Sequence, residues 1–307
     1  MLHTSEISLA TKKKRKKLFT RADISGWLLI APSFILMCVL IIRPQIMGMV
    51  WSTFEMKGFQ VVEFVGLDNF KRVLTNTDFL QTFINTWEYL GWSLVIGLLP
   101  PFIIAIVMNE MAFFRKSIRT LVYFPGIMPA VAVSVLWTFI YQPDTSGLLN
   151  TVLAKIGVEP YGWLQDGRFT ILYIIISMTW SGMGATAIYY FAGLQGVNNE
   201  LYEAAMIDGA GFFTRLRVVV LPYMLPMLLV FAARQCLGVF QVVNQPLQMT
   251  GGGPNNASMS LGLLSYNYAF VNYKPQFAMV VNVITFCVIM IFTLIYSYVD
   301  KRASENM

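Results

Sequence analysis

Six stretches of the 307-residue chain are each long and apolar enough to cross a lipid bilayer as a helix. They lie near residues 25–51, 82–110, 119–141, 169–192, 222–244 and 277–299. A bilayer core needs about 20 apolar residues per helix, and backbone polar groups inside lipid must be satisfied within the segment itself. A membrane β-barrel would need alternating segments of roughly ten residues, whereas these runs are continuous. The sequence therefore predicts an all-α, polytopic membrane protein with six transmembrane helices.

The composition agrees with a membrane protein, because 56% of the residues are hydrophobic and 12% are charged. Soluble domains carry about 25% charged residues. The net charge of +6 comes largely from a basic tail that includes Lys12–Lys17 and Arg21. A basic tail directly before an apolar run is typical of a topology signal rather than of a nucleic-acid surface. The run from Trp27 to Trp51 is too long for the core of a signal peptide, so we expect a retained first span.

The distribution of Lys and Arg predicts the orientation of the chain. With the N-terminus in the cytoplasm, fourteen of the 22 basic residues fall in cytoplasmic segments, six fall in outer loops and two fall within spans. This bias favours cytoplasmic N- and C-termini. The predicted organisation is a cytoplasmic tail at 1–24, a six-helix membrane domain at 25–299 and a second cytoplasmic tail at 300–307.

Prolines interrupt two of the predicted spans. Pro100 and Pro101 lie in the second span, and Pro125 and Pro129 lie in the third. Proline removes a backbone donor and clashes with the preceding turn, so we expect breaks or kinks at these positions.

The connection at 193–222, between the fourth and fifth spans, has the features of a docking element. Asn198 and Asn199 are favoured N-cap residues, and acidic residues follow in the first turns of a short helix. Gly209 and Gly211 then break that helix, and a second helix returns to the membrane at Pro222. The acidic side chains disfavour a helix lying on anionic lipid. The sequence therefore predicts a short helix, a glycine corner and a return helix that contact another protein.

This loop resembles a known motif. The residues Glu203-Ala204-Ala205, Gly209, Val219 and Leu221-Pro222 have the spacing of the EAA loop of permease subunits in ATP-binding-cassette importers. Val219 stands where isoleucine is usual in that family, which is a mild departure. The run from Leu201 to Gly211 is similar to the carbohydrate branch, with its maltose, glycerol-phosphate and lactose types of sugar permease. Phe64–Phe70 and Thr250–Pro254 extend the resemblance across nearly the whole chain.

The resemblance implies a type I importer permease fold and a transmembrane subunit that forms half of the path for a sugar or oligosaccharide. In that family the loop carries a coupling helix that fits a groove on a separate ATPase. The residues expected to make this coupling are Glu203, Ala204, Ala205, Asp208 and Gly209. The implied partners are ABC ATPase subunits, a second homologous permease in a heterodimer, an extracytoplasmic solute-binding protein and membrane lipid, without nucleic acid. The implied location is the cytoplasmic membrane of a bacterium or archaeon.

The chain has no recognisable catalytic or nucleotide-binding motif of its own. No GxxxxGK[ST] loop occurs, and Lys116-Ser117 is preceded by Arg115 where glycine is required. His3 is the only histidine, and the three cysteines lie apart in apolar runs. We therefore expect no enzyme activity, no metal site and no cofactor, and a separate chain that hydrolyses the nucleotide.

The predicted substrate path combines residue chemistry with the resemblance. Sugars present hydroxyl groups and flat apolar faces, which amides and aromatic rings can bind. The middle of the fourth span and the end of the fifth are similar to path-lining segments of the family. The residues expected there are Met178, Trp180, Ser181, Gly182, Gln241, Asn244 and Gln245.

Two charged residues lie inside predicted spans, where ionisable groups are costly and often functional. Glu88 lies about two turns into the second span, and Arg234 lies deep in the fifth. Two interpretations of Arg234 remain open at this stage: a structural pairing with Glu88 or with carbonyl groups, and a place on the substrate path.

The alternative class is a self-contained secondary transporter of a small polar solute. Such a protein would need its own ion-coupling carboxylates, and Glu88 is the only acidic residue predicted away from a span end. No inverted repeat is evident in the sequence.

Overall fold

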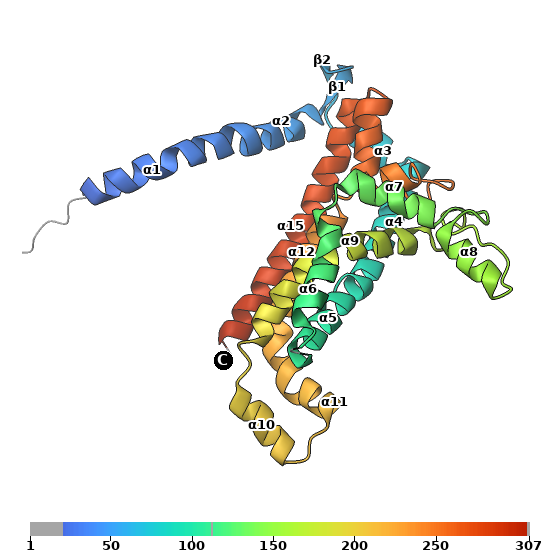
Figure 1. Ribbon diagram of the computed structural model, residues 1–307. Coiled ribbons are helices and arrows are strands. Elements are labelled where there is room, and N and C mark those ends of the chain that lie inside the picture. Colours follow the sequence, from blue (N-terminus) through green and yellow to red (C-terminus); the bar gives the residue numbers. More distant parts are fainter. Residues whose placement is uncertain (1–20, 112, 306–307) are drawn as a thin grey trace, which may run out of the picture. The chain divides into compact units, whose positions relative to one another are not determined.

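The computed structural model describes residues 21–111 and 113–305, and it is almost entirely helical (Figure 1). The chain divides into two compact units, Met1–Gly48 and Met49–Met307. Most of the predicted basic tail, including Lys12–Lys17, lies outside the described residues. Within the described residues, five helices are long and apolar enough to cross a membrane, or six if a sharply bent helix pair is one span. The predicted helical membrane architecture is confirmed.

The first candidate span is Ser25–Trp51, built from α1 (Arg21–Met37), the π-helical η1 (Cys38–Ile42) and α2 (Arg43–Trp51). Within Trp27–Ile46 nearly every large apolar side chain is exposed. A helix that is apolar all round and buries none of its central window is suited to contact with lipid.

The second span, Thr77–Glu110, is broken near its middle into α4 (Thr77–Ile96) and α5 (Leu99–Glu110). Asn76 caps α4 by accepting a hydrogen bond from the Asp78 amide at 2.7 Å. Pro100 and Pro101 stand in the first turn of α5, where a missing backbone donor costs little. The predicted interruption is therefore present as a helix restart at residues 97–98, and the span begins five residues earlier than predicted.

The third span is the bent pair. Helix α6 (Arg115–Tyr123) leads into the 3-10 turn η2 (Phe124–Ile127), and α7 (Ala130–Ile140) leaves at an angle of 101°. Pro129 precedes α7 with an extended ψ of 137°. The predicted proline break is confirmed, and its size makes this segment a broken span or a re-entrant loop rather than a straight helix.

The remaining spans follow the prediction closely except at their ends. Helix α8 (Leu148–Lys155) precedes α9 (Thr170–Leu194), and α12 (Leu221–Val239) follows the predicted docking loop. Because α12 ends at Val239, the predicted fifth span, 222–244, is five residues too long. The last helix, α15 (Pro275–Glu305), runs beyond the predicted boundary at residue 299.

Several short elements lie between the spans where only loops were predicted. Strands β1 (Phe54–Lys57) and β2 (Gln60–Phe64) form an antiparallel hairpin, followed by α3 (Asp68–Leu74). After α12 the chain forms α13 (Asn244–Met249), α14 (Leu261–Tyr266) and the π-helical η4 (Asn267–Val271). The buried Asn69 side chain donates to the carbonyls of Ser52 and Phe54, which ties α3 to the hairpin.

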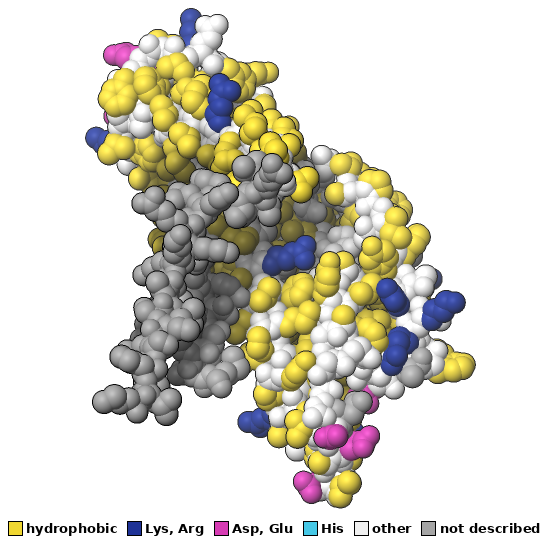
Figure 2. All heavy atoms as spheres, turned by 90° about the vertical axis from the view of Figure 1, so that its left-hand side faces the viewer, with side chains coloured by type: hydrophobic (Ala, Val, Ile, Leu, Met, Phe, Trp, Pro, Cys, Tyr) yellow, Lys and Arg dark blue, Asp and Glu magenta, His cyan; other side chains and the backbone are white. Residues whose placement is uncertain are grey.

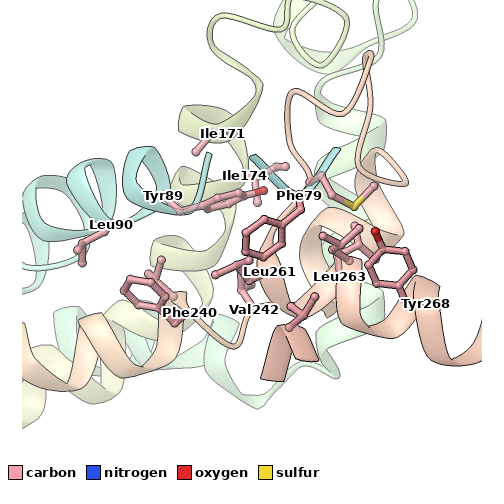
Figure 3. Close-up of a cluster of buried hydrophobic side chains, with 14 of the residues drawn as sticks. Phe79, Tyr89, Leu90, Ile171, Ile174, Phe240, Val242, Leu261, Leu263 and Tyr268 are labelled. Carbon is pink, nitrogen blue, oxygen red and sulfur yellow. The ribbon is translucent and has the colours of Figure 1, made fainter. Parts of the chain in front are cut away.

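The main apolar core lies where α4, α9, α14 and the segment after α12 meet. Figure 3 shows Tyr89 and Leu90 of α4 beside Ile174 of α9, Phe240 and Leu261, with their side chains directed toward one another. A second, smaller cluster surrounds Tyr190, where α5 and α9 pack against the start of α12.

Buried polar side chains of α4 fasten the turn at residues 250–260 to this core. Asn85 Nδ2 donates to the carbonyl of Asn256 at 2.6 Å and to that of Met259 at 3.1 Å. Tyr89 donates its hydroxyl to the Ser258 carbonyl at 2.9 Å. Buried backbone groups need such partners, so α4 fixes the course of the chain that leaves α12.

At Gly184, helix α9 packs closely against the backbone of α6. A Cβ atom at Gly184 would lie 2.3 Å from the Val122 carbonyl oxygen and 2.6 Å from the Tyr123 Cα. The Gly184→Ala variant is expected to lose about 1–3 kcal/mol of stability, because backbone atoms cannot move aside cheaply. The measurement is the apparent melting temperature of the detergent-purified protein. Gly91→Ala is the matched control, because no heavy atom lies within 4 Å of its added methyl group; equal melting temperatures for the two variants would contradict the expectation.

Candidate coupling loop and translocation pocket

The loop between α9 and α12 carries the helix α10 (Asn199–Ile207). Asn198 is the N-cap, and its side-chain oxygen accepts a hydrogen bond from the Glu200 amide at 2.8 Å. Glu200 lies in the first turn, where the helix dipole favours a negative charge. The predicted N-cap and helix start are confirmed.

Gly209 ends α10 in a left-handed conformation with φ of +78°. The Gly209 amide donates to the Met206 carbonyl at 3.0 Å, and the Ala210 amide donates to the Ala205 carbonyl at 2.9 Å. This pair of hydrogen bonds is a Schellman motif, which favours glycine at the left-handed position. The chain then returns through α11 (Phe212–Arg215) and the π-helical η3 (Leu216–Val220) into α12. The predicted glycine corner and return helix are both present.

The outer face of the loop combines acidic and apolar side chains. Glu203, Ala204 and Asp208 are exposed, and Ala205 is half-buried. Ile207 is 87% exposed and Phe213 is 80% exposed, so large apolar groups stand beside the carboxylates. In Figure 2, acidic side chains gather at the lower end of the molecule, where α10 lies in Figure 1. Exposed apolar side chains next to small residues are typical of a surface that another protein covers.

The inner face of α10 is attached to α5 through a cluster that we call the tyrosine latch, formed by Glu110, Tyr202 and Arg215. Tyr202 donates its hydroxyl to Glu110 Oε1 at 2.8 Å, and the Arg215 guanidinium lies 4.7 Å from the centre of the Tyr202 ring. Burial, and then the hydrogen bond to Glu110, raise the pKa of the Tyr202 hydroxyl, so it keeps the proton that it donates. The latch joins the loop to the end of α5.

A second set of contacts supports the same end of α5. Gln195 donates to the Asn109 side chain at 2.7 Å. Arg115 donates to the carbonyls of Met108 and Asn109 and lies 5.0 Å from the Phe191 ring. These carbonyls end α5 and have no partner within the helix, so Arg115 acts as a C-terminal cap.

A cavity of about 280 Å³ lies among the α4–α5 junction, α9 and α12. Of the predicted path residues, Met178 and Gly182 of α9 line it. Trp180 instead packs edge-on against Trp137 at 5.8 Å, and Ser181 donates to the Met178 carbonyl. The reason is helical periodicity: positions 178 and 182 share a face, whereas 180 and 181 lie on the other side.

The polar run after α12 lies apart from this cavity. Gln241 and Asn244 are exposed and Gln245 is half-buried, and none of the three lines the cavity. The chain has already left α12 at Phe240, which is buried in the core. Gln235, which is still within α12, does line the cavity.

Arg234 also lines the cavity, and its side chain is exposed. Among the described residues it makes no ion pair and no hydrogen bond. No ion pair joins Glu88 to Arg234 within the described residues, and the Glu88 carboxylate accepts a hydrogen bond from the Trp92 indole at 3.3 Å. Of the two interpretations of Arg234, the pairing with Glu88 is therefore not observed in the described part of the chain.

Thr179 and Thr186 were not predicted and also line the cavity. The signal that could have found them is the i, i+3, i+7 spacing of Thr179, Gly182 and Thr186, which marks one face of α9. Among the described residues, no three His, Cys, Asp or Glu side chains come together as metal ligands.

The fold and loop define a polytopic helical membrane protein with an exposed helix, α10, between two spans. The chain belongs to the family described as binding-protein-dependent transport system inner membrane component, which matches residues 93–305. It is therefore a multi-pass membrane component of that kind of transport system.

Related proteins match this chain over nearly its full length. The lactose transport system permease protein LacF of Rhizobium radiobacter is 30% identical over 89% of this chain and 92% of its own length. The trehalose/maltose transport system permease protein MalF of Thermococcus litoralis is 31% identical over 93% of this chain and 96% of its own length. A chain of a bacterial ABC transporter involved in alginate import shares the fold, with a TM-score of 0.81 and 22% identity over 92% of this chain and 96% of that chain.

The Tyr202→Phe variant tests whether the latch holds α10. It removes the hydrogen bond to Glu110 and keeps the ring beneath Arg215. Amide hydrogen exchange across residues 199–207 is expected to rise about two- to tenfold, which corresponds to the net value of one hydrogen bond. Tyr189→Phe is the control, because the Tyr189 hydroxyl has no hydrogen-bond partner in the described part of the chain. Unchanged exchange in Tyr202→Phe would show that the stacking alone holds the helix.

Proposed function

We propose that this chain is one of two membrane-spanning subunits of an ATP-binding-cassette importer for a sugar or oligosaccharide. The observation that carries the proposal is the exposed helix α10, which presents Glu203 and Ala204 outward from a loop between two spans. Membership of a binding-protein-dependent transport family supports it. The names of the relatives, which refer to lactose, trehalose/maltose and arabinooligosaccharides, favour a saccharide as the substrate.

In this proposal α10 is the contact with a separate ATPase. Ala204 and Ala205 have short side chains that allow a partner to approach the helix closely, and Glu203 and Asp208 add charge at its rim. Gly209 supplies the turn that lets α10 stand away from the membrane domain. Movement of α10 would pass to α5 through the tyrosine latch and to α9 and α12 through the two ends of the loop.

The cavity among α4–α5, α9 and α12 is the proposed part of the substrate path. Met178 and Gly182 form its wall, and Trp180 and Ser181 support that wall from behind. Gln241, Asn244 and Gln245 follow the end of α12 and are proposed as polar groups at one mouth of the path. A second permease subunit and a solute-binding protein would complete the assembly.

Membership of the binding-protein-dependent family favours this function over the secondary transporter. It also favours a subunit without its own catalysis, and we propose that the partner ATPase hydrolyses the nucleotide. The α10 loop and both chain termini are then cytoplasmic, and the turn at residues 250–260 faces outward. The cytoplasmic membrane of a bacterium or archaeon is the proposed location.

Loss of the ATPase from a loop variant is the main test. The tagged wild-type chain is purified from native membranes in mild detergent. An ABC ATPase and a second permease are expected to co-purify with it, and no other energy-coupling protein. The Glu203→Lys, Gly209→Asp double variant is expected to lose the ATPase, because it reverses a charge and strains a left-handed position. Mass spectrometry of the bound proteins gives the readout.

The matched control is Glu159→Lys, Gly157→Asp, which makes the same changes in the α8–α9 connection, where Gly157 has φ of +77°. This control is expected to retain the ATPase. Absence of any ATPase from the wild-type preparation would contradict the proposed function, and its loss from both double variants would contradict the role of α10.

The proposed orientation can be tested with single cysteines in a chain whose Cys38, Cys236 and Cys287 are replaced. Lys116→Cys lies at the α10 end of α6, and Asn255→Cys lies in the 250–260 turn; both positions are exposed. A membrane-impermeant maleimide added to intact cells or spheroplasts is expected to label position 255 and to leave position 116 unlabelled until the membrane is opened. The reverse pattern would place α10 outside the cell and exclude contact with a cytoplasmic ATPase.

A further inference from the structure

The cavity that contains Arg234 lies at mid-depth in the membrane domain. Gly182, which lines it, is the central residue of the 25-residue helix α9. At 1.5 Å per residue, α9 is about 37 Å long, and its centre lies well away from both membrane surfaces. A ligand in this cavity would therefore be surrounded by the spans rather than held at the surface.

Beside Arg234, the α4–α5 junction and α12 lie close together in the cavity wall. A Cβ atom at Gly97 would meet the side-chain amide of Gln235, so the Gln235 side chain of α12 lies directly against the α4–α5 junction. Gln235 and Arg234 are neighbours in α12, and both line the cavity at this junction. Gly182 and Gly238 have open space where a Cβ would stand, which leaves room within the cavity.

The only charge among the described residues that line the cavity is positive. Arg234 contributes a positive charge, and Thr179 and Gln235 contribute neutral groups that can donate hydrogen bonds. The Thr186 hydroxyl donates to the Gly182 carbonyl at 3.5 Å and offers its oxygen as an acceptor. No Asp or Glu is among the residues that line the cavity. Within the described residues the guanidinium has no ion-pair or hydrogen-bond partner. An ionised group at this depth is costly without a partner, so a site that keeps it exposed is suited to an anionic ligand.

We propose that Arg234 binds an anionic group, a carboxylate or a phosphate, on the saccharide that passes through this chain. The inference rests on the proposed importer function and adds a substrate class to it. The planar guanidinium donates two parallel hydrogen bonds to either group, and the hydroxyls of Thr179 and Thr186 together with the Gln235 amide serve the sugar hydroxyls. The cavity volume of about 280 Å³ is near the lower end of small-molecule sites, so Arg234 meets a short section of the substrate at a time.

Direct binding to the purified complete importer, without its solute-binding protein, tests the inference. The probes are galactobiose, digalacturonate and galactose 1-phosphate, which share galacto-configured rings and differ in charge. The wild type is expected to bind at least one anionic probe about tenfold or more tighter than the neutral disaccharide, as a charged hydrogen-bond pair implies. Higher salt is expected to reduce that preference. Digalacturonate and galactose 1-phosphate separate the carboxylate from the phosphate.

The Arg234→Gln variant is expected to weaken binding of the anionic probe about tenfold more than binding of galactobiose, so that the preference for the anion is lost. Arg234→Lys is expected to retain the charge preference in part, because an ammonium group keeps the charge and loses the paired geometry. Each variant is first checked for co-purification with the ATPase, which shows that the complex is assembled. Equal binding of charged and neutral probes by the wild type would overturn the inference. An equal loss of binding of all probes in Arg234→Gln would also overturn it, because that result indicates that Arg234 pairs with a protein carboxylate.

The result that would contradict the proposed importer function differs from the result that would contradict the proposed substrate class. A wild-type complex that contains no ATPase contradicts the importer itself. A complex that contains the ATPase and imports neutral saccharides in cells, with no preference for an anion at the Arg234 cavity, contradicts only the proposed substrate class.

Discussion

The hydrogen bonds from α4 to the turn at residues 250–260 hold together the part of the molecule on which both functional regions depend. Lipid is as apolar as leucine, so burial of apolar surface does little to bring one span against another in a membrane. Asn85 and Tyr89 instead donate hydrogen bonds to the carbonyls of Asn256, Met259 and Ser258 and so join α4 to this turn. Because that turn follows α12, these contacts set where α12 ends and how it lies against α4.

The same elements connect the cavity to the coupling loop. Helices α9 and α12 form two walls of the cavity, and the loop that carries α10 joins the end of α9 to the start of α12. The third wall is the α4–α5 junction. From there α5 runs to Glu110, which accepts the hydrogen bond from Tyr202 of α10. In the proposed importer, a displacement of α10 would therefore reach all three walls through covalent or hydrogen-bonded connections.

Much of this structure could be predicted from the sequence because membrane helices and caps have local signals. The six apolar runs, the Asn198 cap, the glycine corner and the proline breaks all follow from single residues or short periodic patterns. The end of α12 could not be predicted, since Phe240, Val242 and Val243 are apolar and continue the pattern of the span. Only the tertiary contacts of Phe240 and the 250–260 turn show that the helix has stopped. The path residues predicted in the fourth span, Met178, Trp180, Ser181 and Gly182, lie close together in the sequence, whereas residues on one face of a helix recur every three or four positions. For this reason Thr186, which lines the cavity, was missed, and Trp180 and Ser181 lie away from the cavity.

The π-helical segment η3 explains how one continuous helical run can serve two regions. It lies between Arg215, which stacks on Tyr202, and Leu221, where α12 begins. A π-helical turn accommodates an extra residue and so rotates the following helix relative to the preceding one. With Pro222 and Pro226 close behind, the backbone donors that would enforce regular α-helical register are also missing. The π-helical turn thereby separates the rotation of α11, which carries Arg215 of the tyrosine latch, from the rotation of α12, which lines the cavity. Arg215 and Arg234 can therefore face different regions although they lie in the same run of helix.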